Sequence, residues 1–259
     1  SHHDEIPPAL PEDFGRPAVL IFSKTNGYRH TEAIEAGIPA FEAMGAKRGW
    51  SVFATENGAV HRPELLSRFD AVVWFNVSGD VLDDEQRAAL LAWAKAGGGF
   101  FGVHGTGGDP NYDWEAHPRE LVRAQFSGHP MGPQFQEATV HVEGAAHPAM
   151  RHLDSTWVRT DEWYSFEESP RGPGVHVLAT LDESTYSPRA KIAFIDRDLS
   201  MGADHPIIWT HCLGRGRAIF SALGHQAAAY SEPAHVTFLE EAIAWVMSPP
   251  SEGCVIPSR

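Results

Sequence analysis

The chain has 259 residues and a formal net charge of −14, with 34 acidic against 20 basic side chains. This acidic excess, with no Lys/Arg cluster, excludes nucleic acid and a membrane surface as expected partners and favours a neutral or cationic small molecule. No apolar run is long enough to span a membrane, and the first residues lack the features of a signal peptide, so the cytoplasm is the expected location. A secreted or periplasmic location after removal of a leader is the alternative.

Composition divides the chain into three parts. Residues 1–16 are polar, contain three prolines and are typical of a flexible leader. Residues 17–248 carry the regular apolar patterning of one domain, and residues 249–259 form a C-terminal tail. The two cysteines, Cys212 and Cys254, are too few for a disulfide framework or a zinc finger, and they leave the compartment open.

The first hundred residues alternate between apolar strands and helical periodicity. Asp83 is the expected N-cap of the second helix, which Gly97 ends. The expected order is strand 18–22, helix 31–50 with Thr31 as N-cap, strand 51–54, strand 69–77 around the apolar run 71–75, helix 83–96 and strand 100–103. This alternation predicts an α/β fold with a doubly wound, mostly parallel sheet of flavodoxin-like type.

The second half of the chain has a different pattern. Between residues 110 and 197, short β-branched runs separated by Pro- and Gly-rich turns predict antiparallel strands and long loops on the same sheet, at 139–142, 175–179 and 191–195. Parallel strands are then expected at 207–211 and 217–222, followed by a last helix at 233–247.

Polar segments follow three of the predicted parallel strands, at residues 26–30, 76–80 and 104–106. Ligands of open α/β sheets bind beyond the carboxyl ends of the strands, so these three segments are expected to converge.

The run from Gly97 to Gly105 joins a helix end, a strand and a sharp turn around His104. Glycines on both sides of His104 favour a strand-to-helix elbow that projects the imidazole at the carboxyl end of a strand. Many α/β enzymes hold a serine or cysteine nucleophile at such an elbow. An imidazole there favours an acid, a base or a metal ligand instead.

The chain contains fifteen histidines, and those beside glycine or proline at predicted strand ends are candidates for a site. They are His30, His104, His129, His205 and His225. A single histidine of this kind more often bonds a loop backbone, but His104 and His225 on adjacent strand ends favour a shared function.

The segment Asp161 to Tyr164 places two carboxylates beside two amphipathic aromatic rings. Aromatic faces stack on the C–H patches of sugars while carboxylates and imidazoles bond their hydroxyls, and Tyr28 and Trp114 add further rings. Because side chains alternate along a strand, Glu162 and Tyr164 are expected on one face and Asp161 and Trp163 on the other, with one pair in the pocket.

The sequence holds no spacing diagnostic of a metal site or of a phosphate-binding loop. Separated histidines and carboxylates can still be brought together by a fold. No cofactor is therefore assigned, and a divalent ion such as Zn²⁺ on His30, His104 and His225 stays open as an alternative.

Seven ordered segments between Val19 and Met247 resemble the ThuA-like family of trehalose-utilisation proteins, whose fold is similar to that of class I glutamine amidotransferases. These segments are 22–30, 97–105, 126–130, 161–164, 181–186, 201–206 and 216–225. The chain departs from the amidotransferases where it matters chemically. His104 stands where their elbow holds cysteine, and Ala227 stands where an acidic residue would follow the histidine that matches His225. Glutamine hydrolysis through a thioester is therefore excluded.

The resemblance implies work on glucosides, in the form of keto-sugars made by an oxidoreductase partner of the trehalose-utilisation type. The leading hypothesis is acid–base cleavage or conversion of an oxidised glycoside such as 3-keto-trehalose. His104 and His225 are its acid and base, and Glu162 orients one of them or a metal. The expected substrate contacts are Tyr28, Arg29, His30, Asn76, Trp114, His129, Asp161, Tyr164 and His205. A metal-assisted sugar hydrolase or isomerase and a non-catalytic sugar-binding module are the alternatives, and a homo-oligomer stays open.

Overall fold

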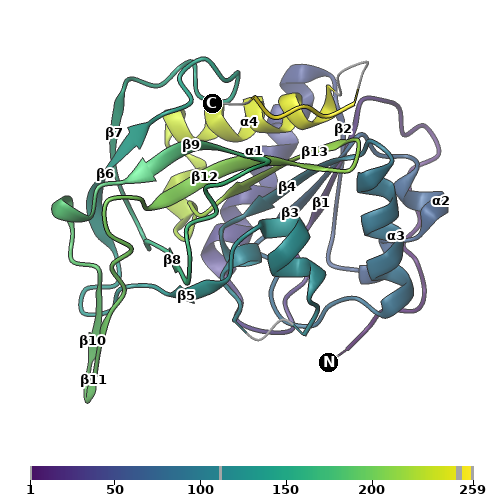
Figure 1. Ribbon diagram of the computed structural model, residues 1–259. Helices are drawn as coiled ribbons and strands as arrows, with labels where there is room; N and C mark the ends of the chain where they lie inside the picture. The colour runs from purple at the N-terminus through teal and green to yellow at the C-terminus, as the bar shows by residue number, and fades with distance from the viewer. Residues whose placement is uncertain (1, 111–112, 249–252, 258–259) are drawn as a thin grey trace.

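The computed structural model describes residues 2–110, 113–248 and 253–257. A nine-stranded sheet in the order β2-β1-β3-β4-β13-β12-β9-β6-β7 runs through the molecule (Figure 1). Its strands are β1 (Ala18–Phe22), β2 (Ser51–Thr55), β3 (Ala71–Phe75), β4 (Gly99–Val103), β6 (Gln136–Val142), β7 (Thr156–Asp161), β9 (Val175–Leu181), β12 (Pro206–Leu213) and β13 (Gly216–Ser221). The helices are α1 (Thr31–Arg48), α2 (Pro63–Leu66), α3 (Asp84–Lys95) and α4 (Pro233–Met247).

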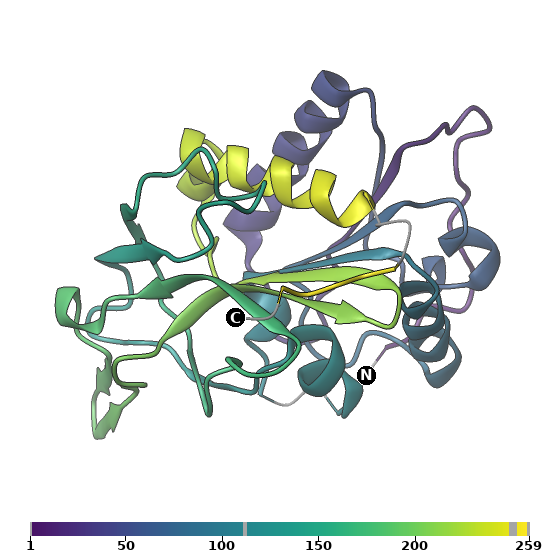
Figure 2. The same ribbon diagram turned by 45° about the horizontal axis from the view of Figure 1, so that its top comes forward.

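The parallel half of the sheet is built from strands that are apolar on both faces. β1, β3 and β4 are completely buried, because α1 and α4 cover one face while α2 and α3 cover the other. Figure 2 shows α1 and α4 together on the same side of the sheet. The predicted α/β fold, doubly wound and mostly parallel, is confirmed.

Helix boundaries follow the local capping chemistry. α3 begins after Asp83, whose carboxylate accepts from the backbone of Gln86 while the Gln86 side chain accepts from the backbone of Asp83, as a capping box requires. α1 differs slightly from the prediction, because its N-cap is His30 and it ends at Arg48, where Gly49 adopts a left-handed conformation.

The predicted parallel direction of β12 is wrong. β12 pairs antiparallel with β13, and only β13 runs parallel to its other neighbour, β4. Gly214 and Arg215 alone separate the two strands, and so short a turn can join only antiparallel neighbours. Together, β12, β9, β6 and β7 form an antiparallel extension of the sheet.

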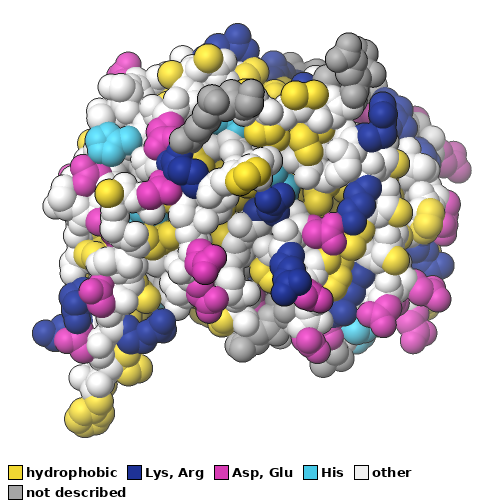
Figure 3. Space-filling model, viewed as in Figure 1, with side chains coloured by type: hydrophobic (Ala, Val, Ile, Leu, Met, Phe, Trp, Pro, Cys, Tyr) yellow, Lys and Arg dark blue, Asp and Glu magenta, His cyan; other side chains and the backbone are white. Residues whose placement is uncertain are grey.

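The segment 191–195 was expected as a strand on this sheet, but it contains the turn of a separate hairpin. β10 (Arg189–Ile192) and β11 (Ile195–Asp198) pair only with each other in the sheets described, and Ala193 in the turn has a φ of 50°. The hairpin projects from the body (Figures 1 and 3). Phe194, in the turn between β10 and β11, is fully exposed. A second small sheet pairs β5 (Phe126–Gly128) with β8 (Ser165–Phe166).

Among the described residues, no helix has the length and apolar character needed to cross a membrane.

The leader contacts the domain at several points. Asp4 accepts hydrogen bonds from the Lys24 ammonium and from the backbone of Gly58. Phe14 packs edge-on against Phe69 at a ring separation of 5.4 Å.

A disulfide joins Cys212 of β12 to Cys254 in the C-terminal tail. The sequence analysis had left these two cysteines without a partner. The bond closes a loop between residues 42 positions apart and holds the tail against the sheet.

Replacing both cysteines by serine is expected to lower the free energy of unfolding by about 2–4 kcal/mol, because the cross-link restricts the unfolded chain. Urea unfolding of the oxidised protein and the double variant measures the difference. Equal midpoints and slopes would show that the cross-link contributes nothing to stability.

Buried His61 makes the protein sensitive to acid. The Trp74 indole N–H donates to Nε2 of His61 at 3.0 Å, so this nitrogen is unprotonated, and Nδ1 donates to the Gly58 carbonyl. Burial lowers the pKa of His61 to about 4. Below pH 6.5 the His61 ring is therefore protonated in the unfolded chain but not in the folded chain. The free energy of unfolding falls as the pH falls towards 4.

Between pH 7 and pH 5, His61 is expected to lower the free energy of unfolding of the wild type by about 2 kcal/mol. The variant His61→Gln should lack this part of the loss. Denaturant unfolding at both pH values measures how far the free energy of unfolding falls in the wild type and in His61→Gln. His141→Gln, on the surface, serves as the control. A variant as acid-sensitive as the wild type would assign the loss to other groups.

Candidate active site

The polar loops after β1, β3 and β4 meet at one edge of the sheet, as expected from the sequence. The backbone of Asn26 donates to the Ser78 carbonyl at 2.8 Å, and the backbone of Gly105 donates to Oδ1 of Asn76 at 2.8 Å. These contacts join the loop after β1 to the loop after β3, and the loop after β3 to the loop after β4.

His104 itself adopts the strained backbone of the elbow, with a φ of 43°. The sequence analysis had placed this freedom in the flanking glycines instead. Gly105 is required for a different reason, because a Cβ there would lie 2.8 Å from both Oδ1 of Asn76 and Nδ1 of His30. A non-glycine residue with positive φ is uncommon, and such strain gathers at functional sites.

The ring of His104 is completely buried and held in one orientation. Its Nδ1 donates to the Ala222 carbonyl at 2.7 Å, so Nε2 of the neutral ring carries a lone pair. Tyr164 stacks on the ring at a centroid distance of 4.1 Å. Nε2 points at two further groups, Nδ1 of His225 at 3.3 Å and Oε1 of Glu162 at 3.4 Å.

Glu162 is the acidic centre of this group. Its Oε1 lies 3.0 Å from Nδ1 of His225, while its Oε2 accepts from the Gln134 side chain. Burial raises the pKa of the Glu162 carboxyl, but the imidazoles of His104, His225 and His129 beside it outweigh burial and hold the pKa below its usual range. Glu162 is therefore an anion at neutral pH.

His30 completes the cluster from the start of α1. Its ring lies 4.7 Å from that of His225 and 4.9 Å from that of His104. Burial, reinforced by the neighbouring imidazoles, lowers the pKa of His30 to about 2, so the ring is neutral. His30, His104, Glu162 and His225 each offer one donor atom, and these four atoms lie within 4.8 Å of one another.

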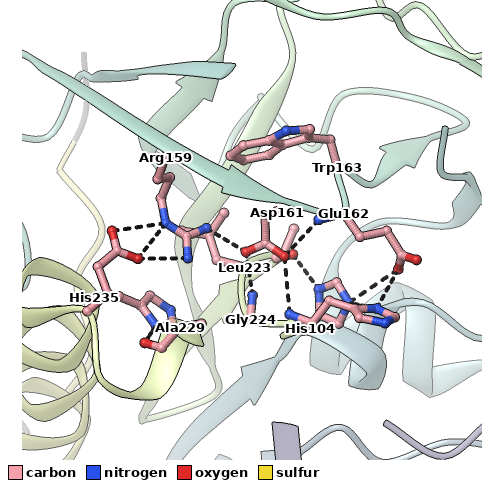
Figure 4. A network of polar contacts seen from close by, with 12 residues as sticks. His104, Arg159, Asp161, Glu162, Trp163, Leu223, Gly224, Ala229 and His235 are labelled. Atoms are coloured by element: carbon pink, nitrogen blue, oxygen red, sulfur yellow. Dashed lines mark hydrogen bonds and ion pairs between the residues drawn. The ribbon is translucent and has the colours of Figure 1, made fainter. Parts of the chain in front are cut away.

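A buried ion pair supports the cluster from behind (Figure 4). Asp161 pairs with Arg159, which in turn pairs with Glu232. The same Asp161 carboxylate accepts from the backbone of Gly224 at 2.8 Å and of His225 at 3.1 Å. Asp161 therefore fixes the loop that carries His225.

A cavity of about 690 Å³ opens over the cluster, large enough for a disaccharide-sized molecule. Its lining residues are Asn26, Gly27, Tyr28, His30, Ser78, Gly79, Gly105, Gly108, Asp109, Pro110, Phe126, His129, Met131, Gln134, Glu162, Tyr164 and His225. Glu162 and Tyr164 line it whereas Asp161 and Trp163 do not, in agreement with the predicted alternation.

Of the substrate contacts expected from the sequence, Tyr28, His30, His129 and Tyr164 line the cavity. The other five lie outside its lining.

Asp161 and Asn76 are buried supports for loops. His205 is buried and bonds the Tyr164 carbonyl at 2.7 Å, and Trp114 packs beside Trp74. Arg29 pairs with Glu56 at the surface. Each of these five side chains has a structural partner and none lines the cavity, so their role as substrate contacts stays a prediction.

Six lining residues lie outside the site residues and polar segments expected from the sequence, namely Gly108, Asp109, Pro110, Phe126, Met131 and Gln134. Asp109 follows the glycine-rich turn and Phe126 and Met131 flank the segment around His129, so proximity in sequence to predicted site residues was an available signal. Gln134 had none, since its loop is placed by long-range contacts.

The model of the ThuA family, described as trehalose utilisation, matches residues 18–246. The chain belongs to the ThuA family. A ThuA-like protein from Bacteroides uniformis ATCC 8492 superposes with a TM-score of 0.77 at 24% identity, covering 95% of this chain and 97% of that one. A second ThuA-like protein, from Parabacteroides merdae ATCC 43184, gives a TM-score of 0.64 at 17% identity, over 90% of each chain.

More distant structures share the fold with this ThuA family member. The cytoplasmic protein STM1381 from Salmonella typhimurium LT2 has a TM-score of 0.57 at 10% identity, covering 88% of this chain and 99% of that one. A β-galactosidase from Rahnella sp. R3 has a TM-score of 0.52 at 16% identity, where 90% of this chain matches 31% of the enzyme. A comparison with curated proteins found no match.

Proposed function

We propose that this ThuA family member is an enzyme that cleaves or converts an oxidised glycoside, with 3-keto-trehalose as the reference substrate. The observation that carries the proposal is the anionic Glu162 and the adjacent His225, both reaching the floor of a cavity of disaccharide size. The family description, trehalose utilisation, supports the substrate class.

The proposed step uses the acidity that a ketone confers on the neighbouring carbon. In a 3-keto-glucoside, C2 lies between the C3 ketone and C1, which bears the glycosidic oxygen. A base removes the C2 proton, the electron pair forms a C1–C2 double bond, and the C1–O bond breaks. The leaving oxygen takes up a proton, so the step needs no oxidant or reductant. Each positioned acid or base contributes about 10²–10⁴-fold.

The roles we propose for these residues differ from those expected from the sequence. His104 is completely buried and does not line the cavity, so it acts as a positioning residue for His225. Glu162 and His225 take the roles of base and acid, because both reach the cavity. Tyr28 and Phe126 offer ring faces for the sugar, and Asp109 and His129 offer polar contacts.

The disulfide bears on where the protein works. Disulfides persist in oxidising compartments and are rare in the cytosol, so the Cys212–Cys254 bond favours a secreted or periplasmic location over the cytoplasmic one. Such a location also requires that the sugar oxidoreductase partner, or its product, reaches the same compartment. Labelling of free thiols in the protein taken directly from cells tests this location. Two reactive thiols would show that the disulfide is absent in the cell and would favour the cytoplasm instead.

Product release from a panel of 3-keto-glucosides, including 3-keto-trehalose, tests the proposed function. We expect turnover by the wild type and by His141→Ala, whose ring lies on the surface beside Asp182. Turnover should be lost in His225→Ala. Binding of the sugars without any product, in the wild type as in the variant, would instead identify a sugar-binding module.

A further inference from the structure

We propose that His30, His104, Glu162 and His225 form a binding site for one divalent transition-metal ion of the zinc type. The proposal rests on the contacts of these four side chains. An ion held by Oε1 of Glu162 and Nδ1 of His225 leaves Oε2 and Nε2 of the same side chains for the roles of base and acid proposed above.

The distances among the donors fit a tetrahedral ion. Ligand atoms about 2.0–2.1 Å from a tetrahedral Zn²⁺ lie about 3.3 Å from one another. Nε2 of His104 lies 3.3 Å from Nδ1 of His225 and 3.4 Å from Oε1 of Glu162, and the third side of this triangle is 3.0 Å. The fourth donor, on His30, is within 4.8 Å of the other three.

The proton count also favours a cation at the centre. His104 uses its one N–H on the Ala222 carbonyl, which leaves a lone pair on Nε2 facing the Glu162 carboxylate. A hydrogen on Nδ1 of His225 can point at Glu162 or at His104, and one proton cannot satisfy both fully. A metal ion accepts electron density from all of these atoms at once.

His30 supplies an independent observation. Its side chain is only 7% exposed, yet Nδ1 is buried without a hydrogen-bond partner among the described residues. A buried imidazole without a partner costs free energy, and such a group calls for an explanation such as an ion.

Outer contacts hold the donors in place, as they do in known metal sites. The Ala222 carbonyl fixes His104, the Gln134 side chain holds the second oxygen of Glu162, and Asp161 anchors the backbone of His225. Three imidazoles and one carboxylate suit Zn²⁺ and its neighbours better than Mg²⁺ or Ca²⁺, which prefer oxygen ligands. His30, Glu162 and His225 line the cavity, so an ion there is accessible to a bound sugar carbonyl.

Metal binding to the full chain tests the site directly. Protein stripped with a chelator and dialysed is titrated with Zn²⁺ by calorimetry and with Co²⁺ by visible absorption. We expect one ion per chain and the absorption of tetrahedral Co²⁺. His30→Ala and Glu162→Gln should each weaken binding by at least about 100-fold, since removing a ligand exceeds the loss caused by an outer contact.

His141→Ala and His3→Ala are the controls, because His141 and His3 carry imidazoles beside the carboxylates of Asp182 and Asp80 away from the cluster. They should bind as the wild type does. Circular dichroism confirms that each variant is folded, and Glu162→Gln keeps the size of the side chain. Absence of a stoichiometric ion, or binding that survives His30→Ala and Glu162→Gln but is lost in His3→Ala, would overturn the site.

The two proposals fail separately. Turnover of keto-glucosides by chelator-stripped protein that binds no ion would overturn the metal site and leave the proposed function intact. An ion bound by the four residues, with no product from any sugar in the panel, would establish the metal site and remove support for the proposed function.

Discussion

Glu162→Gln is expected to lower kcat/KM for a 3-keto-glucoside by about 10²–10⁴-fold, with the fold preserved. The carboxylate is 2% exposed, faces the cavity and contacts both His104 and His225. An amide is neutral, so it can neither accept the C2 proton nor serve as an anionic ligand. The loss should fall mainly on kcat, because the group acts on the reacting atoms more than on binding of the sugar.

The matched control is Gln134→Leu, which removes the side chain that bonds Oε2 of Glu162 and leaves the carboxylate in place. We expect a loss smaller than that of Glu162→Gln. Steady-state kinetics of both variants on one substrate gives kcat and KM for each and compares the two losses. If Glu162→Gln keeps most of its turnover, Glu162 is a structural anion and the chemistry belongs to another lining residue such as Asp109.

The parallel half of the fold could be predicted because its signals are local. β1 and β3 are apolar runs, and the N-cap Asp83 and the stop at Gly97 can be recognised from single residues. The direction of β12 was predicted wrongly, although the two-residue turn at Gly214 shows it. The disulfide could not be predicted from spacing, since Cys254 reaches Cys212 only after the tail has folded back on the sheet.

The candidate site was predictable where chemistry and backbone signals coincide. His104 and His225 stand beside glycines at strand ends, and the structure brings both to Glu162. What the sequence could not distinguish is a polar group that faces the cavity from one that supports it. Asp161 and His205 have the composition of binding residues, but partners distant in sequence turn them to the interior.

Asp161→Asn is expected to lower the free energy of unfolding by about 3–5 kcal/mol, the usual cost of breaking a buried ion pair by removing one partner. Arg159 and Asp161 are both almost completely buried. Burial raises the pKa of the Asp161 carboxyl, but the Arg159 charge holds the pKa below its usual value. The Asp161 carboxylate is therefore charged in the folded protein. Its replacement by asparagine leaves Arg159 with the partly exposed carboxylate of Glu232 as its ion-pair partner.

Urea unfolding measures this loss against Glu232→Gln, which removes the outer carboxylate of the same network and should cost less. A double variant, Arg159→Met with Asp161→Leu, should recover part of the stability, because a buried ion pair can be replaced by apolar side chains. It should not recover turnover, since the backbone of Gly224 and His225 loses its acceptor and the His225 ring loses its support. Full turnover in the double variant would show that Asp161 stabilises the domain without positioning the site.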